Sequence, residues 1–73
     1  MDEQTANKEL RLNVEIVTVM LRRQPHLRTT ETRAAAVATR LAEMFGGTGD
    51  KYREYATAVV RQAEAGGTLA QPS

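Results

Sequence analysis

The sequence predicts an all-α fold, a small three-helix bundle followed by a disordered tail. Apolar residues recur at helical spacing in three segments, and Pro or Gly residues separate these segments. A chain of 73 residues is long enough for one small domain and no more. We therefore predict one helical domain over residues 1–65, with helices over about 6–24, 30–45 and 50–65, and a flexible tail over 66–73.

The first predicted helix has an unusually wide apolar face. Its main stripe consists of Leu10, Val14, Val17 and Leu21, and the face is widened by Leu12, Ile16, Val19 and Met20. Such a helix has to be covered from two directions. The alternating apolar residues would also suit a strand, but the chain contains no second strand to pair with it. Asn13 falls within the apolar face, where it marks either the edge of a groove or a contact with a partner.

Pro25 ends the first helix because it lacks an N–H group and disfavours helical conformation in Gln24, so residues 24–28 form a connector. Thr29 or Thr30 then caps the second helix. Its predicted inner face consists of Ala34, Val37, Ala38, Leu41 and Phe45, and its outer face of Arg33, Ala36, Arg40 and Glu43. The glycines at positions 46 and 47 stop it.

The third predicted helix follows the glycine-rich turn and ends at the glycines of positions 66 and 67. Its inner face consists of Tyr52, Tyr55, Ala56, Val59, Val60 and Ala63, and its outer face of Glu54, Thr57, Arg61 and Glu64. For the two tyrosines, core packing is the main interpretation. Tyr55 lies nearer the margin of this face, and the alternative is that it anchors a partner.

Charge is segregated along the chain. Residues 22–40 contain five arginines and one acid, a net charge of +4, whereas residues 1–21 carry −2 and residues 41–73 carry −1. Arginine forms forked hydrogen bonds with phosphates and carboxylates, so a basic window between acidic flanks indicates an acidic partner. The candidate partner-binding residues are Arg22, Arg23, His26, Arg28, Arg33, Arg40 and Tyr55. The competing interpretation is an ordinary solvated face, in which the arginines at the helix end complement its dipole and Arg40 pairs with Glu43.

Catalysis is the least expected class of function. The sequence shows no nucleophile paired with a base, and His26 stands alone without Cys or a second His to form a metal site. The turn over residues 46–51 lacks the spacing of a phosphate-binding loop. We therefore expect no enzyme activity, no cofactor and no metal. We expect no membrane association either, because no apolar run approaches the roughly 18 residues of a membrane span.

Two classes of binding protein fit the charge pattern. One is a small helical DNA-binding protein, which would have to use the second helix and the connector, because the outer face of the third helix carries Glu54 and Glu64. The other is an interaction protein that covers an acidic surface of a larger assembly. The wide apolar face of the first helix is also compatible with a homodimer.

The size and layout of the chain, with the hydrophobic segment 10–21, the basic connector 22–28 and the Tyr-Arg-Glu-Tyr segment 52–55, resemble the small transcription regulators with which lytic phages bind bacterial RNA polymerase. This resemblance implies a phage protein in the host bacterial cytoplasm, a compartment that suits a chain without Cys. It further implies binding to the large subunits of the polymerase near the RNA exit channel, inhibition of initiation and promotion of antitermination. The basic residues would make a second contact, with nascent RNA or DNA.

Overall fold

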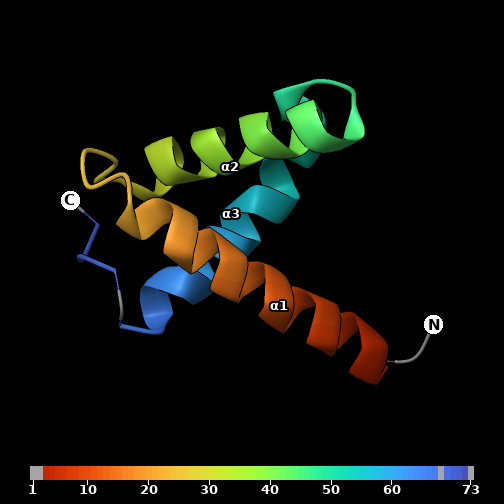
Figure 1. Ribbon diagram of the computed structural model, residues 1–73, viewed down its shortest axis with the longest axis horizontal. Coiled ribbons are helices and arrows are strands. Elements are labelled where there is room, and N and C mark those ends of the chain that lie inside the picture. The colour runs from red at the N-terminus through yellow and green to blue at the C-terminus, as the bar shows by residue number, and fades with distance from the viewer. Residues whose placement is uncertain (1–2, 68, 73) are drawn as a thin grey trace.

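The computed structural model describes residues 3–67 and 69–72, with side chains from residue 13 onward. It contains three helices, α1 (Glu3–Arg22), α2 (Thr30–Phe45) and α3 (Gly49–Ala65), and the described residues contain no strand. Figure 1 shows that α1 and α2 meet at the connector and diverge from there like the arms of a V, with α3 running behind them. The all-α, three-helix prediction is confirmed.

The first helix begins earlier and ends earlier than the sequence predicts. It spans Glu3–Arg22 in place of residues 6–24. At its end, the N–H groups of Arg23 and Gln24 bond to the carbonyls three residues before them, those of Met20 and Leu21, at 3.2 and 3.0 Å. These tighter bonds close the last turn ahead of Pro25, whose ring is incompatible with continued helix.

The bounds predicted for the second helix are confirmed, and its cap is Thr29. The Thr29 hydroxyl accepts a bond from the N–H of Thr32 at 3.1 Å, and the Thr32 hydroxyl accepts one from the N–H of Thr29 at 3.2 Å. This reciprocal pair satisfies two backbone donors at the helix start. At the other end Gly46, with a φ of 86°, donates its N–H to the carbonyl of Ala42 at 2.8 Å and turns the chain away.

We expect Thr29→Ala to lower the free energy of unfolding by about 1 kcal/mol, because it removes the cap of α2. Thr48 provides a matched control, since it occupies the corresponding position before α3 and its side chain makes no capping bond. Thermal unfolding followed by circular dichroism should show a fall in Tm of roughly 4–8 °C for Thr29→Ala. An equal fall for Thr48→Ala would contradict the role of the Thr29 cap.

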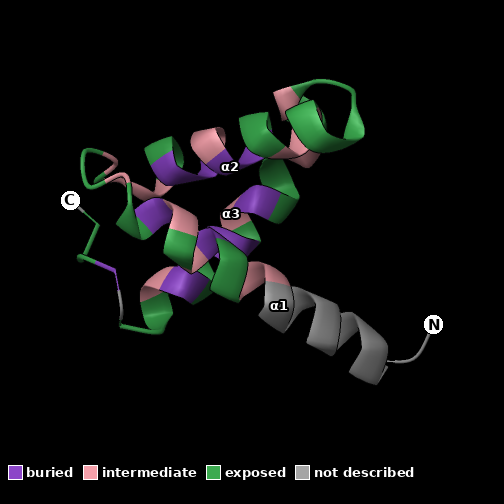
Figure 2. Ribbon diagram, in the orientation of Figure 1, coloured by how far each residue is buried: buried purple, intermediate pink, exposed green. Residues whose placement is uncertain are grey.

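The core lies where α3 meets the other two helices. The most extensive packing is between α2 and α3, whereas α1 packs chiefly against α3. Figure 2 shows buried residues on the facing sides of α2 and α3 and on the second half of α1. The buried apolar residues of the helices are Val17, Leu21, Ala34, Val37, Ala38, Ala56, Val59, Val60 and Ala63. Four of these are alanines, which lets the backbones of α2 and α3 approach closely.

Two apolar expectations of the sequence fail for the same reason. The first helix is covered by α3 but hardly by α2, so Ile16 is 58% exposed; Val19, which borders a hollow beside the end of α3, is 51% exposed. Phe45, predicted on the inner face of the second helix, is 69% exposed. It lies at the end of α2 farthest from the connector, where α1 has diverged from α2 (Figure 1). The helices therefore leave an apolar surface open between α1 and α2.

The described residues after α3, 66–67 and 69–72, are not helical, and two of them contact the body of the domain. Leu69 is buried and joins the core, and the carbonyl of Ala70 accepts a bond from Arg33 at 2.9 Å. The expectation of a flexible tail over residues 66–73 therefore does not hold for Leu69 and Ala70, because the buried side chain and the bonded carbonyl fix them to the body. Among the helices that the structure describes, none has the length and apolar character needed to cross a membrane.

Candidate functional site

Three of the candidate arginines gather at the connector. Arg22 ends α1, Arg23 follows it, and Arg28 lies at the far side of the connector; all three side chains are exposed. A turn in which the N–H of Leu27 bonds to the carbonyl of Gln24 at 3.0 Å keeps the connector compact. None of the three forms a salt bridge with any side chain that the structure describes. We call Arg22, Arg23 and Arg28 the arginine cluster.

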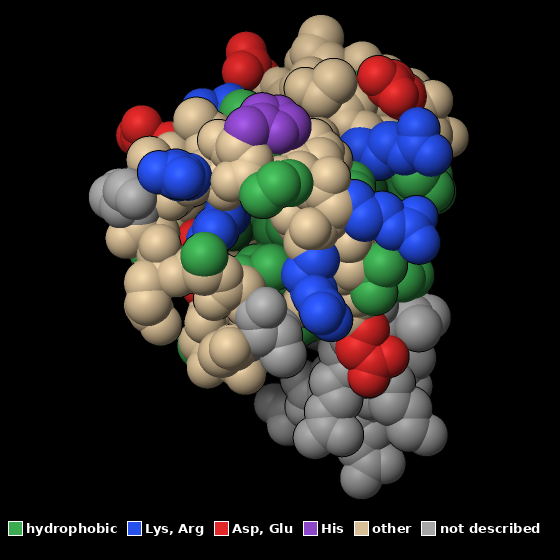
Figure 3. Space-filling view, turned by 60° about the vertical axis from the view of Figure 1, so that its left-hand side comes forward, with side chains coloured by type: hydrophobic (Ala, Val, Ile, Leu, Met, Phe, Trp, Pro, Cys, Tyr) green, Lys and Arg blue, Asp and Glu red, His purple; other side chains and the backbone are tan. Residues whose placement is uncertain are grey.

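The arginine cluster faces outward at the closed end of the V. Figure 3 views this end of the molecule, and Lys and Arg side chains line one flank of it in a column beside hydrophobic side chains. The single histidine, His26, lies at the upper edge of the same face and is exposed. Guanidinium groups placed in this way keep their hydrogen-bond donors available for an anionic surface.

The prediction that Arg33 faces solvent is wrong. Its side chain is only 4% exposed, and its guanidinium reaches three partners in different parts of the chain. Nη1 lies 2.7 Å from Oε2 of Glu64, Nε donates to the carbonyl of Leu27 at 3.0 Å, and Nη2 donates to the carbonyl of Ala70 at 2.9 Å. Arg33 therefore joins the connector, the end of α3 and the final segment, and it does not belong to a partner-binding surface.

Glu64 was also predicted to face outward, and its side chain is only 10% exposed. The hydroxyl of Thr30 donates to its two carboxylate oxygens, at 2.9 and 3.2 Å. A buried charge has to be paired and hydrogen-bonded to be tolerated, and both conditions are met here. We call Arg33, Glu64, Thr30 and the two bonded carbonyls the Arg33 network.

A signal for this pair is present in the sequence. Arg33 lies four residues before Val37, and Glu64 lies four residues after Val60, so each charge extends a row of buried residues along its helix. Opposite charges at the ends of two facing apolar rows indicate a buried ion pair. The charge count of the window alone could not separate Arg33 from the exposed arginines.

Arg40 lies on α2, outside the connector that carries the arginine cluster. It is ten residues beyond the start of α2, about 15 Å along the helix axis. Its guanidinium is 3.4 Å from the carboxylate of Glu43, and both side chains are more than half exposed, so the predicted pair is present and weak. Because Arg33 is buried, the five arginines of the basic window do not form one continuous exposed surface.

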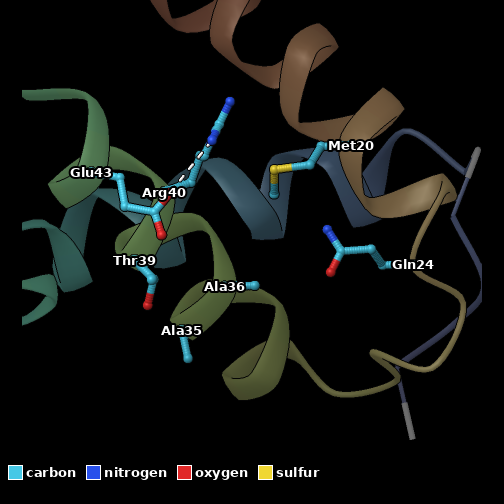
Figure 4. Close-up of a pocket in the computed structure, with 7 residues that line it drawn as sticks. All are labelled: Met20, Gln24, Ala35, Ala36, Thr39, Arg40 and Glu43. Carbon is cyan, nitrogen blue, oxygen red and sulfur yellow. Dashed lines mark hydrogen bonds and ion pairs between the residues drawn. The ribbon is translucent and has the colours of Figure 1, made fainter.

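Arg40 instead borders a hollow between α1 and α2. In Figure 4, Met20 of α1 and Gln24 of the connector point toward α2, where Ala36 points back toward them and Arg40 extends into the space between the helices. A second, apolar hollow of about 120 Å³ adjoins it and shares Met20 and Arg40 as lining residues. We call this apolar hollow the α1–α2 groove; its open rim consists of Ile16, Met44, Phe45 and Tyr55.

Tyr55 lies in this groove and not in the closed core. It is 41% exposed, and its hydroxyl accepts a hydrogen bond from the side-chain amide of Asn13. Asn13 also lines the groove, as the groove-edge interpretation of this residue predicts. The bond joins α1 to α3 at the open end of the V.

Tyr52, one turn earlier, is half-buried and donates its hydroxyl to the carbonyl of Gly46 at 2.7 Å, which fixes the turn between α2 and α3.

The chain matches no family model, no curated protein and no solved structure in the comparisons. The described residues contain no group of three or more His, Asp or Glu side chains that could hold a metal ion. Two surfaces are thus available as candidate sites, the arginine cluster with His26 and the α1–α2 groove with Arg40 and Tyr55.

Proposed function

We propose that this protein is a phage-encoded regulator without chemistry of its own, which docks through the arginine cluster on an acidic surface of the large subunits of bacterial RNA polymerase. By occupying that surface it would inhibit initiation and promote antitermination. The choice of polymerase follows from the resemblance of the sequence to small phage regulators. The observation that carries the docking is the exposure of Arg22, Arg23 and Arg28 without salt bridges to any described side chain.

The three side chains of the arginine cluster have no salt-bridge partner among the described residues. An arginine that already pairs with a carboxylate of its own chain has to break that bond before it can bind a partner. Arg33 is paired with Glu64 in this way, and Arg40 forms a weaker, exposed pair with Glu43. The arginine cluster carries no such cost, and clustered positive charge raises the rate at which an acidic partner is met. The partner would therefore bind chiefly at the connector end of the molecule.

We expect the triple variant R22Q/R23Q/R28Q to bind the polymerase on the order of 100-fold more weakly, if each lost contact costs about 1 kcal/mol. The matched control is K51Q/R53Q/R61Q, which removes three exposed positive charges from α3 and gives the same net charge. Binding is measured with purified polymerase on a biosensor. Transcription on a template with a promoter and a terminator then reports initiation and read-through.

Circular dichroism verifies that both triple variants remain folded. Equal loss of binding in the two variants would show that only net charge matters and would contradict the docking surface. Retention of bare duplex DNA, with no retention of polymerase, would reassign the arginine cluster to nucleic acid. Three phosphate contacts would then give log K a slope of about −2.7 against log salt concentration.

A further inference from the structure

We propose that the α1–α2 groove is an interface between two copies of this chain, related by a two-fold axis. This surface is separate from the arginine cluster, and the proposal does not depend on polymerase binding. The rim of the groove draws large apolar side chains from all three helices. Ile16, Met44, Phe45 and Tyr55 are 58%, 60%, 69% and 41% exposed. A contiguous apolar surface of this kind on a small protein marks a place where another protein packs.

The charges at the groove favour a second copy over a foreign acidic partner. Arg40 lines the groove, and Glu43 lies one helical turn further along α2; their side chains are 63% and 61% exposed. Together they carry no net charge. In a two-fold interface each surface meets itself, so Arg40 of one copy can approach Glu43 of the other without repulsion. A partner with a uniformly acidic surface would instead place its carboxylates against Glu43.

The position of the arginine cluster fits the same arrangement. The connector lies at the closed end of the V and leads into the start of α2, about 15 Å along the helix axis before Arg40, whereas Met44 and Phe45 lie at the other end of α2, toward the open end. Two copies that meet through their grooves therefore keep their positive ends apart. The like charges of the two clusters would oppose a dimer formed at the connector end.

The core of a single copy is small, so a second copy that covers the groove would add to its stability. Val59 and Val60 are the largest side chains that are completely buried, and α1 packs chiefly on α3. Both Val59 and Met20 line the groove, so a copy seated there would cover the core from the side that α2 leaves open. Burial of the rim would then stabilise each fold by an amount that depends on protein concentration.

The first test compares two exposed apolar residues of α1. Ile16 borders the groove, whereas Val19 lines a different hollow, on the side of α1 that meets the end of α3. Glutamate is a better helix former than either, so neither Ile16→Glu nor Val19→Glu weakens the helix itself. Sedimentation velocity on the full chain over a concentration series should show a reversible dimer. The dissociation constant should rise about 30-fold or more for Ile16→Glu, as for a central interface residue, and stay unchanged for Val19→Glu.

The second test separates pairing between copies from pairing within one. The variants R40E and E43R each lose the pair and present like charges across the two-fold axis. An equimolar mixture restores opposite charges only between copies, so it should form a heterodimer tighter than either variant alone, measured by native mass spectrometry.

A wild-type chain that stays monomeric at high concentration overturns the proposal. Equal weakening by Ile16→Glu and Val19→Glu, or a mixture no tighter than its components, overturns it as well. If the wild-type chain is monomeric and Ile16→Glu loses polymerase binding, the groove belongs to that partner and not to a second copy.

Discussion

Arg33→Ala is expected to lower the free energy of unfolding by about 3–5 kcal/mol, because it leaves the carboxylate of Glu64 buried without its counter-charge. The same change removes the donors to the carbonyls of Leu27 and Ala70. A domain of 73 residues has a total stability of roughly 4–11 kcal/mol. The variant should therefore be marginally folded or unfolded at 25 °C, which urea titration with circular dichroism at 222 nm measures directly.

Arg40 supplies the matched control for Arg33. It lies on the same helix and also pairs with a glutamate, but both partners are exposed. Arg40→Ala should change the stability of the monomer by less than about 1 kcal/mol. The double variant R33M/E64L should recover part of the loss, because it removes both buried charges together. A cost for Arg33→Ala as small as that of Arg40→Ala would contradict the Arg33 network as a structural element.

Ala56→Leu is expected to be the next most damaging change, with a loss of about 2–3 kcal/mol. Ala56 is completely buried in α3, the helix that forms the most extensive packing of the molecule. Three additional carbons at this position would force neighbouring side chains from their preferred rotamers and push helix backbones apart. Denaturant unfolding and the Tm from thermal scans report the loss.

Ala58 lies on the same helix two residues later, and it is exposed. Alanine and leucine have similar helix propensities, so Ala58→Leu should leave stability within about 0.5 kcal/mol of the wild type. The comparison isolates packing from helix propensity. If Ala56→Leu proved equally neutral, the space between the helices would be looser than the structure shows.

The helices could be predicted from the sequence because their signals are local. A threonine before an apolar period and two glycines after it define the second helix, and these residues act on their immediate neighbours. Pro25 likewise ends α1 through its own ring. Such signals act within a few residues and do not depend on how the helices pack against one another.

The candidate site was less predictable because it depends on how the helices are placed relative to one another. Arg33 and Arg40 belong to the same charged window, yet one is buried against Glu64 and the other is exposed. Phe45 belongs to an apolar row, yet α1 has turned away where that row ends. Arg33 is buried because the start of α2 lies against the end of α3, whereas Phe45 is exposed because α1 diverges from α2, and the charge count of the window contains neither placement.

The unequal packing of the three helices also sets the order in which they can assemble. Helices α2 and α3 are joined by three residues, so their mutual contacts require the closure of only a short loop and a small loss of chain entropy. Contacts between α1 and α3 span a much longer stretch of chain. We therefore expect the α2–α3 hairpin to form first and α1 to dock onto it afterwards.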